Sequence, residues 1–84
     1  MTRPKPVSVG QLLAMDADTR AATIRALSPI ARRKLAHLAA LGGETAATKA
    51  DAYLATGNHP WCLLHIGRAR EYARVGAALT TEEP

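Results

Sequence analysis

Three residues in the last third of the chain have the side chains needed for metal binding or nucleophilic chemistry. They are His59, Cys62 and His65, spaced three residues apart. Imidazole and thiolate are common ligands of Zn²⁺, and a helix N-terminus can activate a cysteine thiol. On a helix, however, each step of three residues turns the side chain by about 60°, so the two histidines point about 120° apart. We therefore expect no metal site and no cofactor.

Other catalytic patterns are equally weak in this sequence. The acidic residues are few and scattered, so no pair of carboxylates is indicated for acid–base work. The only double glycine, Gly42-Gly43, is typical of a helix stop rather than of a phosphate-binding loop. Cysteine catalysis at Cys62 would need an oxyanion site and a cleft, which a small alanine-rich chain does not indicate. We expect a protein that is not an enzyme and has no catalytic residues.

Length and composition set the class of the protein. With 84 residues and 48% hydrophobic content, the chain holds a single hydrophobic core. One cysteine excludes an internal disulfide, which favours a reducing, cytoplasmic location. No apolar run is long enough to span a membrane, and the N-terminus lacks the apolar segment of a signal peptide. Eight arginines against three lysines indicate a GC-rich bacterial, phage or mobile-element source.

Charge is distributed unevenly along the sequence. Residues 1–43 carry seven basic and two acidic residues, a net charge of +5, whereas residues 44–84 have a net charge of −1. A basic half can attract nucleic acid or an acidic protein. We accordingly divide the chain into a flexible basic arm (1–7), a single helical domain (8–79) and an acidic tail (80–84).

Helix-capping residues predict an all-α fold, a compact bundle of about five short helices. Ser8, Asp16 and Ser28 are each placed to cap a helix start, and Gly42-Gly43 and Gly57 are placed to end one. No segment alternates between apolar and polar residues over the length of a strand. The expected helices are Val9–Met15, Ala17–Leu27, Pro29–Leu41, Glu44–Thr56 and Pro60–Leu79.

Helical spacing predicts which faces of the longer helices are buried. In the helix 29–41, the expected core residues are Ala31, Leu35, Leu38 and Leu41. In the last helix, one narrow stripe consists mainly of small residues, which would allow a close approach by another helix. That stripe contains Cys62, Ile66, Ala69, Ala73 and Gly76.

The last helix also has the composition of a protein-binding surface. Trp61 begins it, and tryptophan is strongly enriched among the residues that anchor interfaces. We expect binding to another protein, with homodimerisation as part of that role because a thin core gains from a partner. The expected protein-binding residues are Trp61, Leu63, Leu64, Arg68, Arg70 and Arg74.

The alternative is a DNA-binding regulator that uses the basic N-terminal half. A helix-turn-helix could be formed by residues 29–41 with 44–56, or by residues 44–56 with 60–79. In the first pair the recognition helix would begin with Glu44, which repels phosphate. In the second pair it would begin with apolar residues, which cannot form hydrogen bonds to base edges. Contact with phosphates alone is the simpler form of this alternative. The residues expected to bind nucleic acid are Arg3, Lys5, Arg32, Arg33, Lys34 and Lys49.

Overall fold

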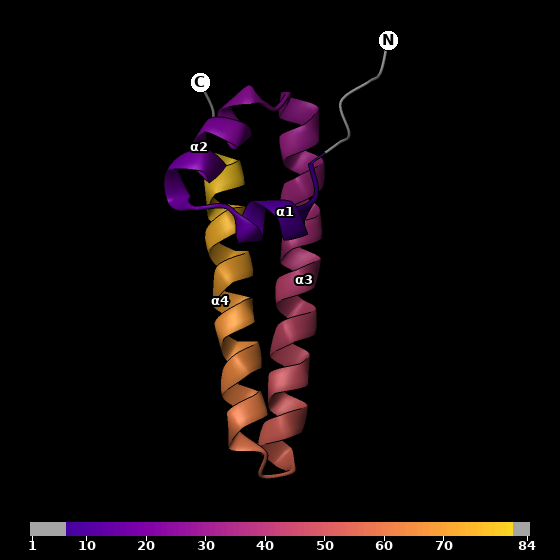
Figure 1. Ribbon diagram of the computed structural model, residues 1–84. Coiled ribbons are helices and arrows are strands. Elements are labelled where there is room, and N and C mark those ends of the chain that lie inside the picture. The colour runs from indigo at the N-terminus through magenta and orange to yellow at the C-terminus, as the bar shows by residue number, and fades with distance from the viewer. Residues whose placement is uncertain (1–6, 82–84) are drawn as a thin grey trace.

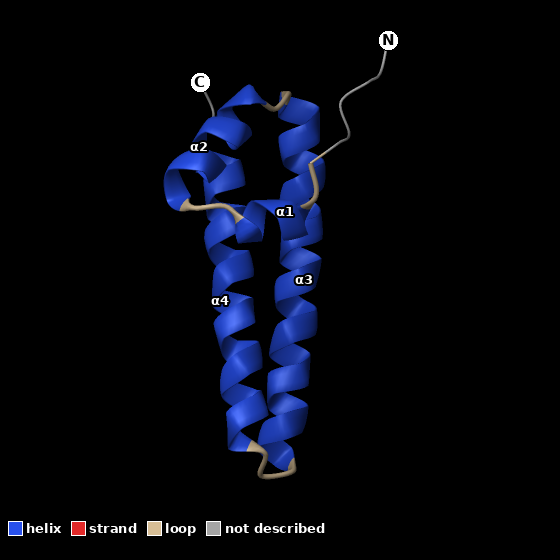
Figure 2. Cartoon of the chain, viewed as in Figure 1, coloured by secondary structure: helices blue, strands red, loops and turns tan. Residues whose placement is uncertain are grey.

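The computed structural model describes residues 7–81, and within that range the chain is helical with short connections (Figures 1 and 2). This confirms the all-α class but corrects the helix count, since four helices are present rather than five. Two are short and two are long. Their bounds are Val9–Ala14 for α1, Ala17–Ala26 for α2, Pro29–Ala55 for α3 and His59–Thr81 for α4. The expected arm and tail lie mostly outside the described residues.

The first three helices begin where their caps predict. Ser8 and Gln11 form a reciprocal capping box, and the Ser28 hydroxyl accepts a hydrogen bond from the Ala31 amide at 3.1 Å. The Asp16 carboxylate accepts a hydrogen bond from the Thr19 amide at 2.7 Å. That bond stabilises the charged form and lowers the pKa of Asp16 below its ordinary value of 3.8.

Arg20 joins the first two helices. Its guanidinium donates to the carbonyl oxygens of Leu12 at 2.8 Å and Met15 at 2.9 Å, with a longer bond to Leu13. The Leu13 and Met15 carbonyls lie at or just beyond the end of α1, where no further turn of helix can satisfy them. The Leu12 carbonyl also accepts a hydrogen bond from the Met15 amide at 3.3 Å. The side chain on α2 therefore fixes the direction of the turn between α1 and α2.

The prediction that Gly42-Gly43 ends a helix is wrong. Helix α3 runs through both glycines without a break, so the expected helices 29–41 and 44–56 are one. The reason lies across the hairpin, where the ring of Tyr72 packs against α3 at this point. A methyl group at Gly42 would lie 2.5 Å from Tyr72 Cε1, closer than carbon atoms can approach. Glycine is present because the two helices approach closely here, and not because the chain turns.

Helices α3 and α4 form a long antiparallel hairpin. They lie side by side along their whole length, with the 56–58 connection at the tip (Figure 1). Gly57 makes the turn with a φ of +78°, and the Asn58 side chain accepts from the Trp61 amide at the start of α4. The shape is elongated, 50 × 29 × 21 Å. Helices α1 and α2 pack at the end of the hairpin far from the tip.

The main core lies at that end, where four helices meet. Leu12, Ile24 and Val75 are completely buried there. The rest of this cluster is Val9, Leu35, Ala39 and Leu79. Toward the tip only α3 and α4 remain, and the residues buried between them are small or polar: Ala46, Ala50, Cys62 and His65.

Two of the predicted faces are partly wrong for the same reason. Leu35 is buried, but Leu38 and Leu41 are 53% and 45% exposed. On α4, Cys62 is buried and Ala69 half-buried as expected, but Ala73 is exposed. Each long helix has one neighbour over most of its length, so its buried stripe is narrower than the face expected inside a bundle. No helix within residues 7–81 has the length and hydropathy to cross a membrane.

Candidate functional site

A shallow groove between α3 and α4 is lined mainly by small apolar side chains. Its volume is about 540 Å³, and it lies along the seam of the hairpin. Nearly all of its lining is alanine or glycine, with Glu44 and Thr80 as the polar members and Tyr72 as the aromatic one. Helix α3 contributes Ala36, Ala39, Ala40, Gly43, Glu44 and Ala47, and α4 contributes Ala69, Tyr72, Ala73, Gly76 and Thr80.

The lining forms two rows with the same spacing. Helix α3 supplies Ala36, Ala40, Gly43 and Ala47, and α4 supplies Ala69, Ala73, Gly76 and Thr80. Both rows step by four, three and four residues, which is the repeat that keeps side chains on one side of a helix facing a neighbour. The hairpin seam explains the inner members of the groove, since a methyl group added at Gly76 would lie 3.8 Å from the Ala39 methyl, an ordinary van der Waals contact. The outer members, Ala40, Ala47 and Ala73, are exposed.

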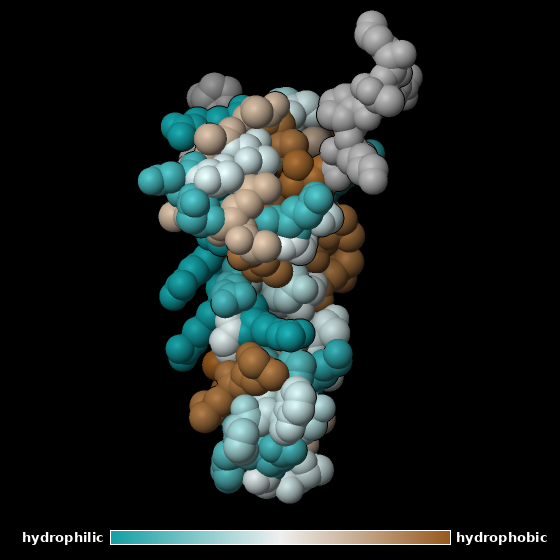
Figure 3. Space-filling model, in the orientation of Figure 1, coloured by the Kyte–Doolittle hydropathy of each residue, from teal (hydrophilic) through white to brown (hydrophobic). Residues whose placement is uncertain are grey.

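The hairpin also exposes an unusual number of large apolar side chains for so small a chain. Leu54 lies seven residues beyond Ala47, so it continues the α3 row of the groove toward the tip. In Figure 3 hydrophobic patches appear at more than one height along the hairpin, separated by hydrophilic side chains. The large apolar side chains of the hairpin that are at least 45% exposed are Ile30, Leu38, Leu41, Leu54, Trp61, Leu63 and Leu64.

The residues expected to bind a protein are all exposed but do not form one surface. Positions along a helix are about 100° apart, which separates the six into two groups on opposite sides of α4. Trp61, Leu64 and Arg68 share one side. The other three are Leu63, Arg70 and Arg74.

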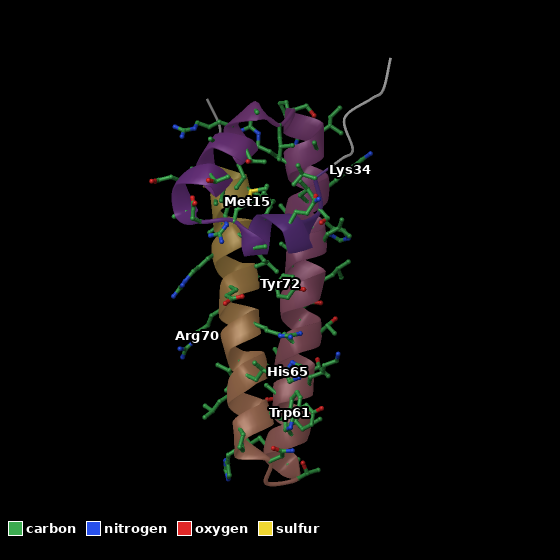
Figure 4. All side chains as sticks on the ribbon, in the orientation of Figure 1. Met15, Lys34, Trp61, His65, Arg70 and Tyr72 are labelled. Atoms are coloured by element: carbon green, nitrogen blue, oxygen red, sulfur yellow. The ribbon has the colours of Figure 1, made fainter. Side chains whose placement is uncertain are left out.

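Trp61 belongs to an aromatic cluster at the tip. Its ring lies 5.9 Å from Tyr53 and 6.3 Å from His65, centroid to centroid, and Tyr53 and His65 stack at 5.4 Å with nearly parallel planes. Figure 4 shows Tyr72, His65 and Trp61 following one another along the hairpin toward the tip. Trp61 is 50% exposed. One part of its ring therefore holds the hairpin together while the rest faces solvent.

The residues expected to bind nucleic acid are also dispersed. Arg33 and Lys34 are exposed near the start of α3, and Arg32 beside them is half-buried. Lys49 is 15 residues further along the same helix, about 22 Å away at 1.5 Å per residue. Arg3 and Lys5 lie outside the described residues.

Neither helix-turn-helix pairing corresponds to the arrangement of the helices. One of the two expected pairs is a single continuous helix, α3. The other is the α3–α4 hairpin, in which the helices run side by side (Figure 1). A helix-turn-helix instead crosses its two helices at about 90–120°.

The histidine and cysteine residues of α4 have separate environments. His59 is exposed, the free thiol of Cys62 is buried, and His65 is buried in the aromatic cluster. Within the described part of the chain, no three His, Cys, Asp or Glu side chains gather closely enough to hold a metal ion.

Half of the groove could be predicted from the sequence, because Ala69, Ala73 and Gly76 of α4 belong to the expected stripe of small residues. The α3 half could not, because Gly42-Gly43 was expected to end a helix between Ala40 and Ala47. The four-three-four spacing of Ala36, Ala40, Gly43 and Ala47 places them on one face only if residues 42 and 43 are helical. Comparisons with protein-family models, curated proteins and solved structures found no match for this chain.

Proposed function

We propose that this protein is a non-enzymatic binding module that uses the groove between α3 and α4 to hold a helix of another protein. The observation that carries the proposal is the pair of matched small-residue rows, Ala36 to Ala47 and Ala69 to Thr80, lining one open groove. Small side chains on two adjacent helices let a third helix approach closely and insert larger side chains between them. Such a partner would complete a three-helix layer along the hairpin.

The thin core supports the same proposal. Between the tip and the α1–α2 end, the hairpin buries mainly Ala46, Ala50 and Cys62, which provide little apolar area. Exposed leucines such as Leu54 lie next to this region. Covering them with a partner would remove further apolar surface from water and stabilise the hairpin by mass action.

The chemistry of the groove indicates the kind of partner. An amphipathic helix with leucine-sized residues at i, i+3, i+4 and i+7 has the pattern that such grooves accept. Glu44 is the charged residue in the lining, so a basic residue beside the apolar stripe would pair with it. A second copy of this chain is one form that the partner can take, since α3 and α4 themselves have helical apolar stripes.

Capture of a partner from an extract of the source cells tests the proposal. The immobilised full chain is compared with Ala73→Arg and Ala40→Glu, which place charge at exposed groove positions without disturbing the core. Losing a buried interface contact commonly costs about 2 kcal/mol or more, roughly 30-fold in affinity. We expect both variants to lose the partner that the parent captures.

Ala22→Arg is the matched control, because Ala22 is exposed on α2, outside the groove lining. It should capture the partner as the parent does, and circular dichroism should show all four proteins equally helical. Capture that survives in both groove variants would contradict the proposal. The DNA-binding alternative predicts instead a salt-dependent mobility shift with duplex DNA that Arg33→Gln and Lys34→Gln weaken.

A further inference from the structure

The hairpin has a second, smaller pocket across the seam from the groove. It has a volume of about 180 Å³ and is lined by both long helices. Its residues include Thr45 and Lys49 of α3 and His65, Arg68 and Tyr72 of α4. Thr45 and Lys49 are each two positions beyond a groove residue of α3, about 200° around the helix, so the pocket faces the other way.

Positive charge and hydrogen-bond donors converge in this pocket. Lys49 and Arg68 approach it from opposite helices, and no acidic residue of the described chain is among its lining. Glu44 precedes Thr45 in sequence but lines the groove on the other side of the seam, and neither Asp51 of α3 nor Glu71 of α4 lines the pocket. The cations are therefore not neutralised from within the pocket.

Two aromatic side chains, His65 and Tyr72, add further hydrogen-bond donors to the two cations. His65 is only 7% exposed and lines the pocket, yet within residues 7–81 its ring makes stacking contacts and no hydrogen bond. The Tyr72 hydroxyl likewise has no hydrogen-bond partner in the described chain. The His65 nitrogens and the Tyr72 hydroxyl are not among the fully enclosed polar atoms of the described chain that lack a partner, so they reach solvent and can donate to a ligand in the pocket. By contrast, the Thr45 hydroxyl already donates to the Leu41 carbonyl at 3.0 Å.

Gly42 is what allows Tyr72 to occupy this place. The Tyr72 ring covers Gly42 so closely that Cζ would lie 2.7 Å from an added methyl group. The ring is thereby held close against α3 beside the pocket. Packing between the two helices therefore fixes the position of the Tyr72 ring, which is not free to change rotamer as an exposed side chain would be.

We propose that this pocket binds a phosphate group. The pocket presents an ammonium, a guanidinium, an imidazole and a phenol. Together these groups offer more hydrogen-bond donors than the two oxygens of a carboxylate accept. A phosphate carries about 1.5 to 2 negative charges and three or more acceptor oxygens, which matches two cations and two further donors. At about 30 Å³ per water molecule, the pocket holds several waters that such a group would displace.

Titration of the full chain with sodium phosphate, followed by NMR, tests this proposal. A parallel titration with sodium chloride at equal ionic strength is the control. Saturable shifts at Lys49, His65, Arg68 and Tyr72, absent with chloride, are expected. Lys49→Gln and Arg68→Gln should each weaken binding by about fivefold or more. Tyr72→Phe and His65→Phe should also weaken it while keeping the ring contacts, and thus the fold.

Arg70→Gln is the matched control, since it removes the same charge from the opposite side of α4. It should change phosphate affinity by less than about twofold, the scale of exposed charge effects. Equal weakening by Arg70→Gln, or identical shifts with chloride, would overturn the proposal, because either means general charge screening.

A second arm identifies the source of the phosphate group. A short DNA duplex added to the phosphate-loaded protein should displace free phosphate from the pocket if a nucleic-acid backbone is the natural source. If the pocket signals stay at their phosphate-bound positions, the site prefers a free phosphate or a small phosphorylated molecule. The pocket and the groove open on different sides of the seam and have only Tyr72 in common among their lining residues, so the outcome for the Lys49 and Arg68 variants does not depend on the proposed function.

Discussion

The ring of Tyr72 on α4 lies directly over Gly42 on α3, at a place where a single methyl group would reach within 2.5 Å of the ring. This contact joins positions 30 residues apart and sets the distance between the two long helices. It explains why α3 continues through two adjacent glycines, a pair that lowers helix propensity by about 1 kcal/mol each relative to alanine.

Gly42→Ala should therefore destabilise the protein, despite the better helix propensity of alanine. The added methyl forces the Tyr72 ring or α4 to move, a cost of roughly 1–3 kcal/mol that opposes a gain of about 1 kcal/mol. Gly67→Ala is the control, because nothing lies within 4 Å of the added methyl, and it should raise stability by about 0.5–1 kcal/mol. Urea unfolding measures both. If Gly42→Ala were as stabilising as Gly67→Ala, the Tyr72 contact would not exist.

Substitution by leucine should destabilise the protein at a buried alanine of the hairpin and have little effect at an exposed one. Ala39 is 1% exposed, so Ala39→Leu must place extra carbon atoms into a filled helix contact, at roughly 1–3 kcal/mol. Ala73 is exposed at the edge of the groove, and Ala73→Leu should change the free energy of unfolding by less than about 0.5 kcal/mol. Thermal melts of the two variants check this. A large loss in Ala73→Leu would show that α4 is rotated relative to α3.

Acid should weaken the protein partly through Asp16. The hydrogen bond from the Thr19 amide lowers the folded-state pKa of this carboxyl below its ordinary value of 3.8. Its contribution is therefore present above the unfolded pKa and is lost as the pH falls through the lowered folded pKa. Asp16→Asn keeps a capping oxygen but does not titrate. Comparing unfolding midpoints at neutral pH and at about pH 2.5 should show a smaller acid loss in Asp16→Asn than in the parent. Equal losses would mean that the charge of this cap does not matter.

Features decided by neighbouring residues were predictable from sequence, and features decided across the hairpin were not. Ser8, Asp16 and Ser28 act within three residues of themselves, and each cap is where the sequence places it. Gly42-Gly43 is locally indistinguishable from a helix stop, because its role depends on Tyr72. Because residues 29–41 and 44–56 form one helix rather than two, the faces of α3 that are exposed to solvent differ from those expected in a five-helix bundle.

The same limit applies to the binding surfaces. The sequence indicates that Trp61 and the arginines of α4 are available, and the structure finds them exposed. Their division between two sides of α4 follows from the spacing of about 100° per residue, although we expected them to form one surface. What the sequence could not show is that Lys49 of α3 and Arg68 of α4 line one pocket, since pairing across a hairpin depends on register.

The most direct test of groove binding is NMR of alanine methyl groups in the full chain, titrated with the captured partner. We expect the signals of Ala40, Ala47 and Ala73 to shift or broaden on saturation, while that of Ala22 on α2 stays in place. Shifts confined to the Trp61 indole and the leucine methyls near the tip, with the three groove alanines unchanged, would contradict the account and assign binding to the tip instead.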